Sequence, residues 1–120
     1  MNLSQIIKTL VSEIKLTEIQ AKIFLHIVIH GKMNISKLSS DLNISINDAT
    51  QNSKKLVELG GFIDMPNDEF EAMHPRFTAV NMYRKMCERE QKEFKKNLNI
   101  DNIGVALEVS YDDARTKYNK

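Results

Sequence analysis

The chain has 120 residues, which suits one domain with its own hydrophobic core. With 42% apolar residues, 28% charged residues and a net charge of +1, it is neither a disordered chain nor a strongly basic tail. No apolar run approaches the ~20 residues of a transmembrane helix, and a single cysteine, Cys87, excludes an internal disulfide and suits a reducing cytoplasm.

Two helices are predicted first, over residues 3–14 and 18–30. In the first, apolar residues recur at steps of three and four, which gives one buried stripe. Thr17 and Gln20 have the spacing of a capping box, so the second helix begins directly after Thr17. Gly31 is a natural residue to end it.

A pair of shorter helices follows, after a connection at residues 32–35 that could form one extended rung. Ser36 is the expected cap of the first helix, which ends at Asn43-Ile44-Ser45. Ser45 is the expected cap of the second, and Gly60-Gly61 is a strong signal for its end.

A β-hairpin is predicted directly after these helices. Residues 62–65 and 70–73 read as short strands, and Pro66-Asn67-Asp68 between them has the composition of a turn.

The remainder is predicted as one long helix and a tail. Pro75 fits the first turn of a helix that runs to Lys96. Residues 97–109 fit either a short helix or a strand, because both periodicities are present. We divide the chain into a domain at 1–74, a long helix with its extension at 75–109, and a flexible tail at 110–120.

This order predicts a mostly α fold with a small β-hairpin, specifically a winged helix-turn-helix with a long C-terminal helix. The helix over residues 46–59 would bury Ile46, Ala49, Ser53, Leu56 and Gly60. Its other face carries residues that can bond base edges or phosphates in a major groove, namely Asn47, Thr50, Gln51 and Lys54. Any surface helix also turns polar residues outward, so the turn and the hairpin around it carry the prediction.

Residues 16–76 resemble the winged-helix domain of the archaeal TrmB regulators. The resemblance rests on "LTEIQAKIFLHIVIHG", "LVELGGFI" and the step from the hairpin into "AMHPRFTAV". It implies a DNA-binding transcriptional regulator, usually dimeric. We expect the protein to act on double-stranded DNA in the cytoplasm. The DNA contacts that it implies fall at Ser45 and the four polar residues above, and we add the neighbouring Lys55.

The chain departs from that family in two places. Larger members carry a C-terminal sugar-binding domain, for which residues 97–120 are too few, so no sugar effector is carried over and any effector is unknown. The hairpin contains Asp64, Asp68, Glu69 and Glu71 without one lysine or arginine. Phosphate contact requires basic residues, so the hairpin either avoids the DNA backbone or serves another partner. The alternative function is therefore a winged-helix module that binds a protein within a transcription assembly.

The predicted long helix has a basic face and an apolar stripe. The basic face is either a solvated surface laced with charge pairs or a flank that contacts phosphate. The stripe either covers the first helix within the chain or forms the seam of a homodimer. We predict the dimer, because a helix of this length outreaches so small a domain. Its seam would contain Phe77, Val80, Tyr83, Cys87, Phe94 and Leu98.

Nothing in the sequence indicates an enzyme, a cofactor or a metal. It has no glycine-rich phosphate loop, no nucleophile elbow and no paired-carboxylate pattern. His26 and His30 have the spacing of a two-ligand metal face but lack a third ligand at a fixed spacing. Cys87 lies in the apolar stripe, where a thiol is more often inert than reactive.

Overall fold

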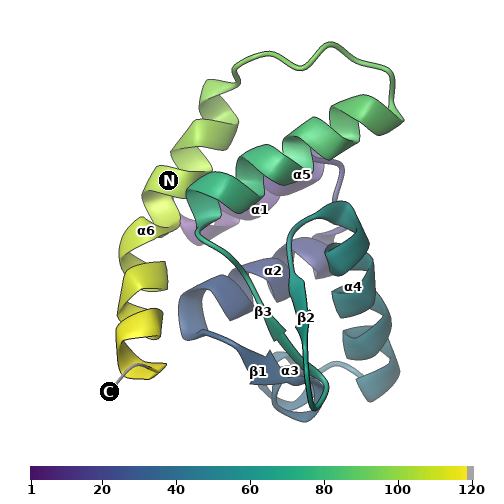
Figure 1. Ribbon diagram of the computed structural model, residues 1–120, viewed down its shortest axis with the longest axis vertical. Coiled ribbons are helices and arrows are strands. Elements are labelled where there is room, and N and C mark those ends of the chain that lie inside the picture. The colour runs from purple at the N-terminus through teal and green to yellow at the C-terminus, as the bar shows by residue number, and fades with distance from the viewer. Residues whose placement is uncertain (119–120) are drawn as a thin grey trace.

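The computed structural model describes residues 1–118, with side chains as far as Thr116. Within that range the protein is mostly helical, with a small antiparallel sheet of three strands, so the fold class is confirmed at this level (Figure 1). The helices are α1 (Leu3–Glu13), α2 (Glu18–His30), α3 (Ile35–Leu42), α4 (Ile46–Leu59), α5 (Pro75–Arg89) and α6 (Leu98–Tyr118). The strands are β1 (Met33–Asn34), β2 (Ile63–Met65) and β3 (Glu69–Glu71).

The first two helices begin at capping boxes. The box at Thr17 and Gln20 is present as predicted, with each side chain bonded to the other residue's backbone N–H. A second box, which the sequence analysis did not use, starts α1 with Asn2 and Gln5. These local bonds satisfy N–H groups that have no partner inside the helix.

α3 begins two residues earlier than expected, at Ile35, and its cap is Asn34 rather than Ser36. The Asn34 side-chain oxygen accepts a hydrogen bond from the Lys37 backbone N–H at 2.9 Å. Asn34 is also the last residue of β1, where it pairs with Glu69. The cap moves to Asn34 because the chain leaves the sheet at this residue, and asparagine caps a helix as well as serine does.

The sheet has the strand order β1-β3-β2, so β3 lies in the middle. β2 and β3 form the predicted hairpin, with Met65 opposite Glu69 and a turn of three residues between them. The turn has left-handed conformations at Asn67 and Asp68, residue types that adopt them more readily than most. The extended rung after α2 is therefore a true third strand, β1, which pairs with β3.

α2 is the centre of the core. Its residues Ala21, Ile23, Phe24, Leu25, Ile27 and Val28 are all buried. α1, α4 and α6 each pack on it, and α6 also packs closely along α5. A helix that is apolar nearly all round has to be enclosed by other elements in this way.

The predicted helix over residues 75–96 is too long. α5 ends at Arg89, where Gln91 adopts a left-handed conformation and the Lys92 N–H donates to the Cys87 carbonyl at 2.8 Å. No glycine or proline marks this end, so the sequence signal was absent. The chain turns here and returns as α6, which packs against α5 instead of extending away from it.

The predicted flexible tail is also wrong over residues 110–118, because α6 continues through them. Its buried residues recur at steps of three and four: Ile100, Ile103, Leu107, Tyr111 and Ala114. Such a series keeps one face of a helix against a core. Residues 119–120 of the predicted tail lie outside the described residues.

The Glu13 carboxylate helps to fix the start of α6. It accepts hydrogen bonds from the side chains of Asn97, at 3.2 Å, and Asn99, at 3.1 Å. Asn97 also accepts from the Asn99 backbone N–H at 3.0 Å, as a helix cap does. These bonds tie the end of α1 to the start of α6.

None of the helices in the described part is both long enough and apolar enough to cross a membrane.

Candidate nucleic-acid interface

A tight turn joins α3 to α4. Asn43 adopts a left-handed conformation, with φ 54° and ψ 50°, and ends α3. The Ile44 backbone N–H donates to the Ser39 carbonyl at 3.1 Å, and the Ser39 hydroxyl donates to the Ile44 carbonyl at 2.6 Å. Ser39 thus closes the turn from both sides, and the direction of α4 is fixed by local bonds.

α4 buries the face that the sequence predicted, apart from its ends. Ala49, Ser53 and Leu56 are fully buried against α2 and α3, and Leu59 is nearly so. Ile46 was expected inside but is 53% exposed. It is the first residue of α4 and lies at the edge of a hollow next to the hairpin turn. Gly60, also expected inside, is half-buried and caps the helix in a left-handed conformation.

Five of the six predicted DNA-contacting residues lie on the open side of α4. Asn47, Gln51, Lys54 and Lys55 are exposed, and Thr50 is half-buried beside them. The Gln51 side-chain N–H donates to the Asn47 side-chain oxygen at 3.2 Å, which holds both amides in place.

The two lysines differ in their partners. Lys55 pairs with Glu58 at 3.3 Å, whereas Lys54 forms no ion pair with any side chain among residues 1–116. Ser45, the sixth predicted residue, is exposed but caps α4 by accepting from the Asp48 N–H at 3.0 Å. Of the six, Lys54 is therefore the side chain best placed to meet a phosphate.

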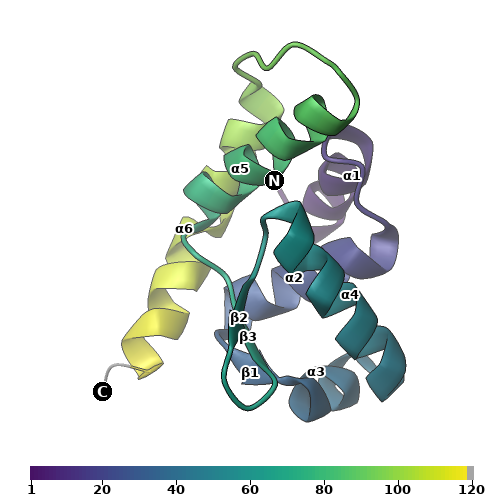
Figure 2. The same ribbon diagram turned by 45° about the vertical axis from the view of Figure 1, so that its right-hand side comes forward.

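The hairpin turn lies beside the start of α4. Figure 2 shows α3, the first turns of α4 and the tip of the hairpin at the same end of the molecule. A hollow of about 270 Å³ separates them, with Ile46 and Thr50 on one side and Asn67 and Asp68 on the other. The Ile35 N–H donates to the Asp68 carbonyl at 3.2 Å, so the turn is bonded to the start of α3. The sequence alone does not show this hollow, because only the fold brings residues 34–36, 46–50 and 67–68 together.

The acidic hairpin is less charged than its sequence suggests. Glu71 forms an ion pair with Arg115 of α6. Asp64, Asp68 and Glu69 have no such partner among residues 1–116. Three uncompensated carboxylates therefore lie on the hairpin, and Asp68 is at the edge of the hollow.

A charged cluster ties α3 to α2. The His26 Nε2 lies 2.8 Å from the Asp41 Oδ2, and the Lys37 Nζ lies 3.3 Å from the same oxygen. The hydrogen bond from His26 lowers the pKa of Asp41, and the bond and charge of Lys37 lower it further, against a smaller rise from burial. The Nε2 atom of His26 is thus hydrogen-bonded to the Asp41 carboxylate. The ring of His30, one turn further along α2, lies tilted against that of His26, with 4.5 Å between the ring centroids.

The six predicted seam residues do not form one helical stripe. Phe77, Val80, Tyr83 and Cys87 are on α5, but Phe94 lies in the connection after it and Leu98 begins α6. Cys87 is buried within the chain, and Val80 and Tyr83 pack partly against the core. Phe94 returns to Tyr83, with 5.9 Å between ring centroids. The predicted seam is wrong, because the helix predicted to contain all six residues ends at Arg89.

Of the seven basic residues in the predicted helix over residues 75–96, four form ion pairs, one of them Arg76 with Glu108, whereas Lys85, Arg89 and Lys96 form none with a side chain among residues 1–116. Arg84 contacts Glu88, Lys92 contacts Glu90 and Lys95 contacts Glu93, each within 3.5 Å. This arrangement favours the reading as a solvated surface laced with charge pairs. It leaves α4 as the better candidate for contact with phosphate.

His74, Glu108 and Asp112 come close enough together to raise the question of a metal. The His74 Nδ1, however, accepts the Arg76 backbone N–H at 3.1 Å and caps α5. The neutral ring therefore carries its proton on Nε2, the atom 3.6 Å from Glu108. Arg76 already pairs with that carboxylate at 3.0 Å. The chemistry is that of a structural cluster that holds the start of α5 against α6.

Comparisons of the chain with models of protein families, with curated proteins and with solved structures found no match.

Proposed function

We propose that the protein is a DNA-binding transcriptional regulator of the winged-helix class, which inserts α4 into the major groove of double-stranded DNA. The observation that carries the proposal is the open face of α4. Its polar side chains are exposed, while the opposite face is locked into the core by the bonded turn at Asn43. A helix presented in this way can enter a groove without any change in the fold.

The surrounding elements support this class. The order from α2 to β3 is helix, strand, helix, tight turn, helix and hairpin. The hairpin turn lies beside the start of α4, where a wing would flank a recognition helix. The TrmB resemblance over residues 16–76 points to the same function. We propose contact with bases through the Asn47 and Gln51 amides and with phosphate through Lys54.

We also propose that more than one copy of the protein binds each DNA site. The copies do not meet through the predicted helix seam. Cys87 is buried within the chain, and the exposed Phe77, Phe94 and Leu98 belong to α5, to the connection after it and to the start of α6. A contact between copies therefore does not use these six residues as one continuous seam.

A protein-binding module is the second candidate, and the hairpin favours it. Asp64, Asp68 and Glu69 have no ion pair among the described side chains and would suit a basic partner. Exchange of Asp68 and Glu69 for lysine separates the two functions. If DNA is the ligand, the double variant should bind DNA more tightly, with a steeper salt dependence of up to ~0.9 per new phosphate contact. If the acids are themselves the binding site, the folded variant should lose its ligand.

The deciding experiment is a titration of mixed genomic DNA fragments at several salt concentrations, followed by fluorescence anisotropy. We expect binding at low salt and a linear fall in log K with log salt, because binding to phosphates releases counterions. A folded protein that binds no DNA even at low salt would exclude the DNA-binding function and leave the protein module as the better account.

A further inference from the structure

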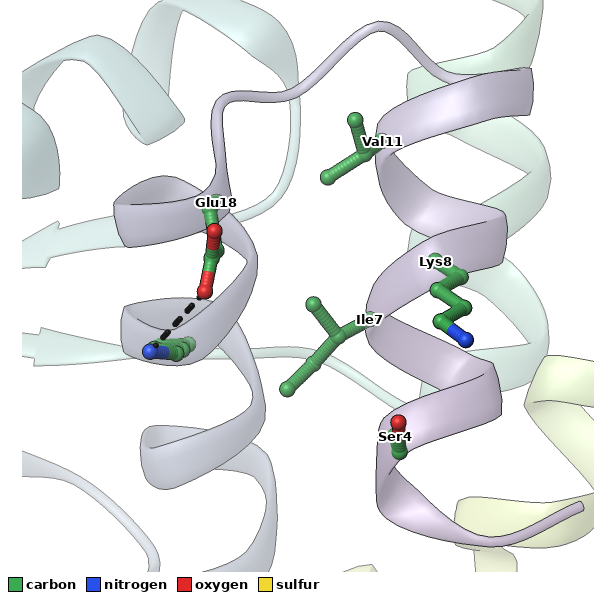
Figure 3. A pocket seen from close by; sticks show the side chains of 6 residues that line it. Ser4, Ile7, Lys8, Val11 and Glu18 are labelled. Atoms are coloured by element: carbon green, nitrogen blue, oxygen red, sulfur yellow. Dashed lines mark ion pairs between the residues drawn. The ribbon is translucent and has the colours of Figure 1, made fainter.

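An apolar groove lies between α1 and α2, on a surface that the proposed DNA contacts do not use. It has a volume of about 580 Å³ and is lined by Ser4, Ile7, Lys8, Val11, Glu18 and Lys22. Figure 3 shows Ile7 and Val11 pointing from α1 toward α2, while Lys8 lies over α1 itself. Val11 is 37% exposed, so the groove presents aliphatic surface to solvent.

The groove continues into two neighbouring hollows that share Lys22 as a lining residue. One reaches Leu42 and Ile44 at the turn before α4, and the other runs along Leu3 and Ile29. The whole surface is a broad apolar area with a polar rim. Contiguous apolar areas of this kind mark sites of protein contact on otherwise polar surfaces.

The charge of the groove is positive. Glu18 pairs with Lys22 at 3.1 Å, and the two charges cancel. Lys8 is exposed and has no ion pair among residues 1–116. The ligand that fits is therefore a helix with an aliphatic row and neighbouring carboxylates.

α6 has that surface. Opposite its buried face, Leu98, Val105 and Val109 are 67%, 54% and 70% exposed. Steps of seven and four residues place these three side chains in one row. Asp101, Asp112 and Asp113 flank the row, and none of them forms an ion pair with a side chain that the structure describes. Along the helix axis the row is about 16 Å long, at 1.5 Å per residue.

We propose that the α6 row of one copy binds in the α1–α2 groove of a second copy. Each surface supplies what the other lacks: the groove is concave and positive, and the α6 row is convex and negative. Pairing of two α6 rows would bring the unpaired aspartates together, and pairing of two grooves would leave Lys8 opposite Lys8. Within one chain the row cannot reach the groove, because the opposite side of α6 packs on α5 and α2.

This contact joins different surfaces of the two copies. Figure 2 shows α6 along one side of the molecule and α1 with the start of α2 on the other. A bound pair therefore keeps one free groove and one free α6 row, so association proceeds head to tail and not to a closed two-fold dimer. The contact does not involve α4 and does not depend on DNA binding.

Analytical ultracentrifugation without DNA tests the proposal. The contact is small compared with a stable interface, so we expect concentration-dependent association of the wild type with a Kd on the order of 100 µM. Val11→Glu in the groove and Val109→Glu on α6 should each weaken it about tenfold or more, because each buries an unpaired charge. Ile63→Glu places the same charge on an exposed aliphatic residue of β2 and should leave association unchanged. Circular dichroism confirms that each variant is folded.

Mixing the two variants gives the sharpest result. Val11→Glu retains its α6 row and Val109→Glu retains its groove, so the mixture should form one-to-one pairs with the affinity of the wild type and should stop at two chains. Lys8→Glu should weaken wild-type association severalfold and reduce its dependence on salt.

Three outcomes would overturn the proposal. The first is a wild type that remains monomeric to about 500 µM, a range in which a contact of this size should be populated. The second is loss of association in only one of the two glutamate variants, which would mean groove against groove or α6 against α6. The third is a mixture of the two variants that remains monomeric.

Discussion

α4 and α6 are alike in having one buried face, but their exposed faces differ in polarity. Each buries one face against α2, and each leaves the other face open. The open face of α4 carries amides, a hydroxyl and two lysines, whereas that of α6 carries Leu98, Val105 and Val109. A polar open face loses little in water and can exchange its water for bases and phosphates. An aliphatic open face gains from being covered, so the two helices are suited to different partners.

The buried faces should be equivalent even though the open faces differ. Leu56 of α4 and Leu107 of α6 are both almost completely buried. Replacement of either by alanine should lower the free energy of unfolding by about 2–5 kcal/mol, from lost burial and the cavity that remains. Urea unfolding followed by circular dichroism measures both. A Leu107→Ala variant with wild-type stability would show that α6 is only loosely attached, and the comparison of the two helices would fail.

The difference between the two helices also explains what the sequence could predict. Local residues mark the ends of α2 and α4: Thr17 and Gln20 start α2, Ser45 starts α4 and Gly60 ends it. A helix end that uses such residues can be recognised without knowledge of the rest of the fold.

The C-terminal third is determined by distant contacts. The end of α5 carries no local stop residue, and Glu13 of α1, more than eighty residues away in sequence, bonds Asn97 and Asn99 at the start of α6. The apolar series from Ile100 to Ala114 was visible in the sequence, but alternation over Val105–Tyr111 competed with it. For the candidate site, periodicity identified the open face of α4. It did not show the exposure of Ile46, the pairing of Lys55 or the position of the hairpin turn, which depend on tertiary packing.

A close approach of backbone is found where α6 crosses the start of α5. A Cβ added at Gly104 would lie 2.6 Å from the Arg76 Cα, a contact with backbone that cannot easily yield. Gly104→Ala should therefore lower stability by about 1–3 kcal/mol, as overpacked sites do, although alanine favours helices. The exposed Ala106 of the same helix serves as the control, because Ala106→Gly should cost about 1 kcal/mol through helix propensity alone. A stabilised Gly104→Ala variant would place α5 and α6 farther apart.

The open face of α4 is tested at Gln51. If its amide reads a base edge, Gln51→Ala should cost ~1–3 kcal/mol on a preferred DNA site and little on random DNA, because a bidentate contact discriminates by that amount. The preferred site is first selected from the genomic fragments, and the affinities are then compared by anisotropy. Val109→Ala on the open face of α6 provides the control and should leave the affinity of one protein molecule for DNA unchanged. Equal losses on preferred and random DNA would show that Gln51 does not read sequence.

A smaller effect should distinguish the two lysines of α4. Lys54 has no ion pair among the described side chains, whereas Lys55 is held by Glu58 at 3.3 Å. Lys54→Ala should weaken binding to all DNA and reduce the salt slope by about one unit, since one phosphate contact is lost. Lys55→Ala should change the slope less. If the two variants behave in the reverse way, the ion pair with Glu58 opens on binding and Lys55 makes the contact.

The smallest effect concerns the carboxylates that hold each helix pair. Asp41 ties α3 to α2, and Glu108 ties α6 to the start of α5. Because the His26 hydrogen bond and Lys37 hold the pKa of Asp41 below its ordinary value of 3.8, the folded state retains this carboxylate in its charged form more strongly than the unfolded chain does. The stabilisation is complete above the pKa of the unfolded chain and disappears as the pH falls through the lower pKa of the folded state. Asp41→Asn should therefore lose more stability at pH 6 than at pH 2, as measured by urea midpoints at both values. When Asp41→Asn is made in a His26→Ala background, the difference between its stability losses at the two pH values should shrink more than in a Lys37→Ala background. The reason is that the hydrogen bond from His26 is the larger cause of the lowered pKa of Asp41. An Asp41→Asn variant with the same loss at both pH values would show that Asp41 contributes by packing and not by its charge.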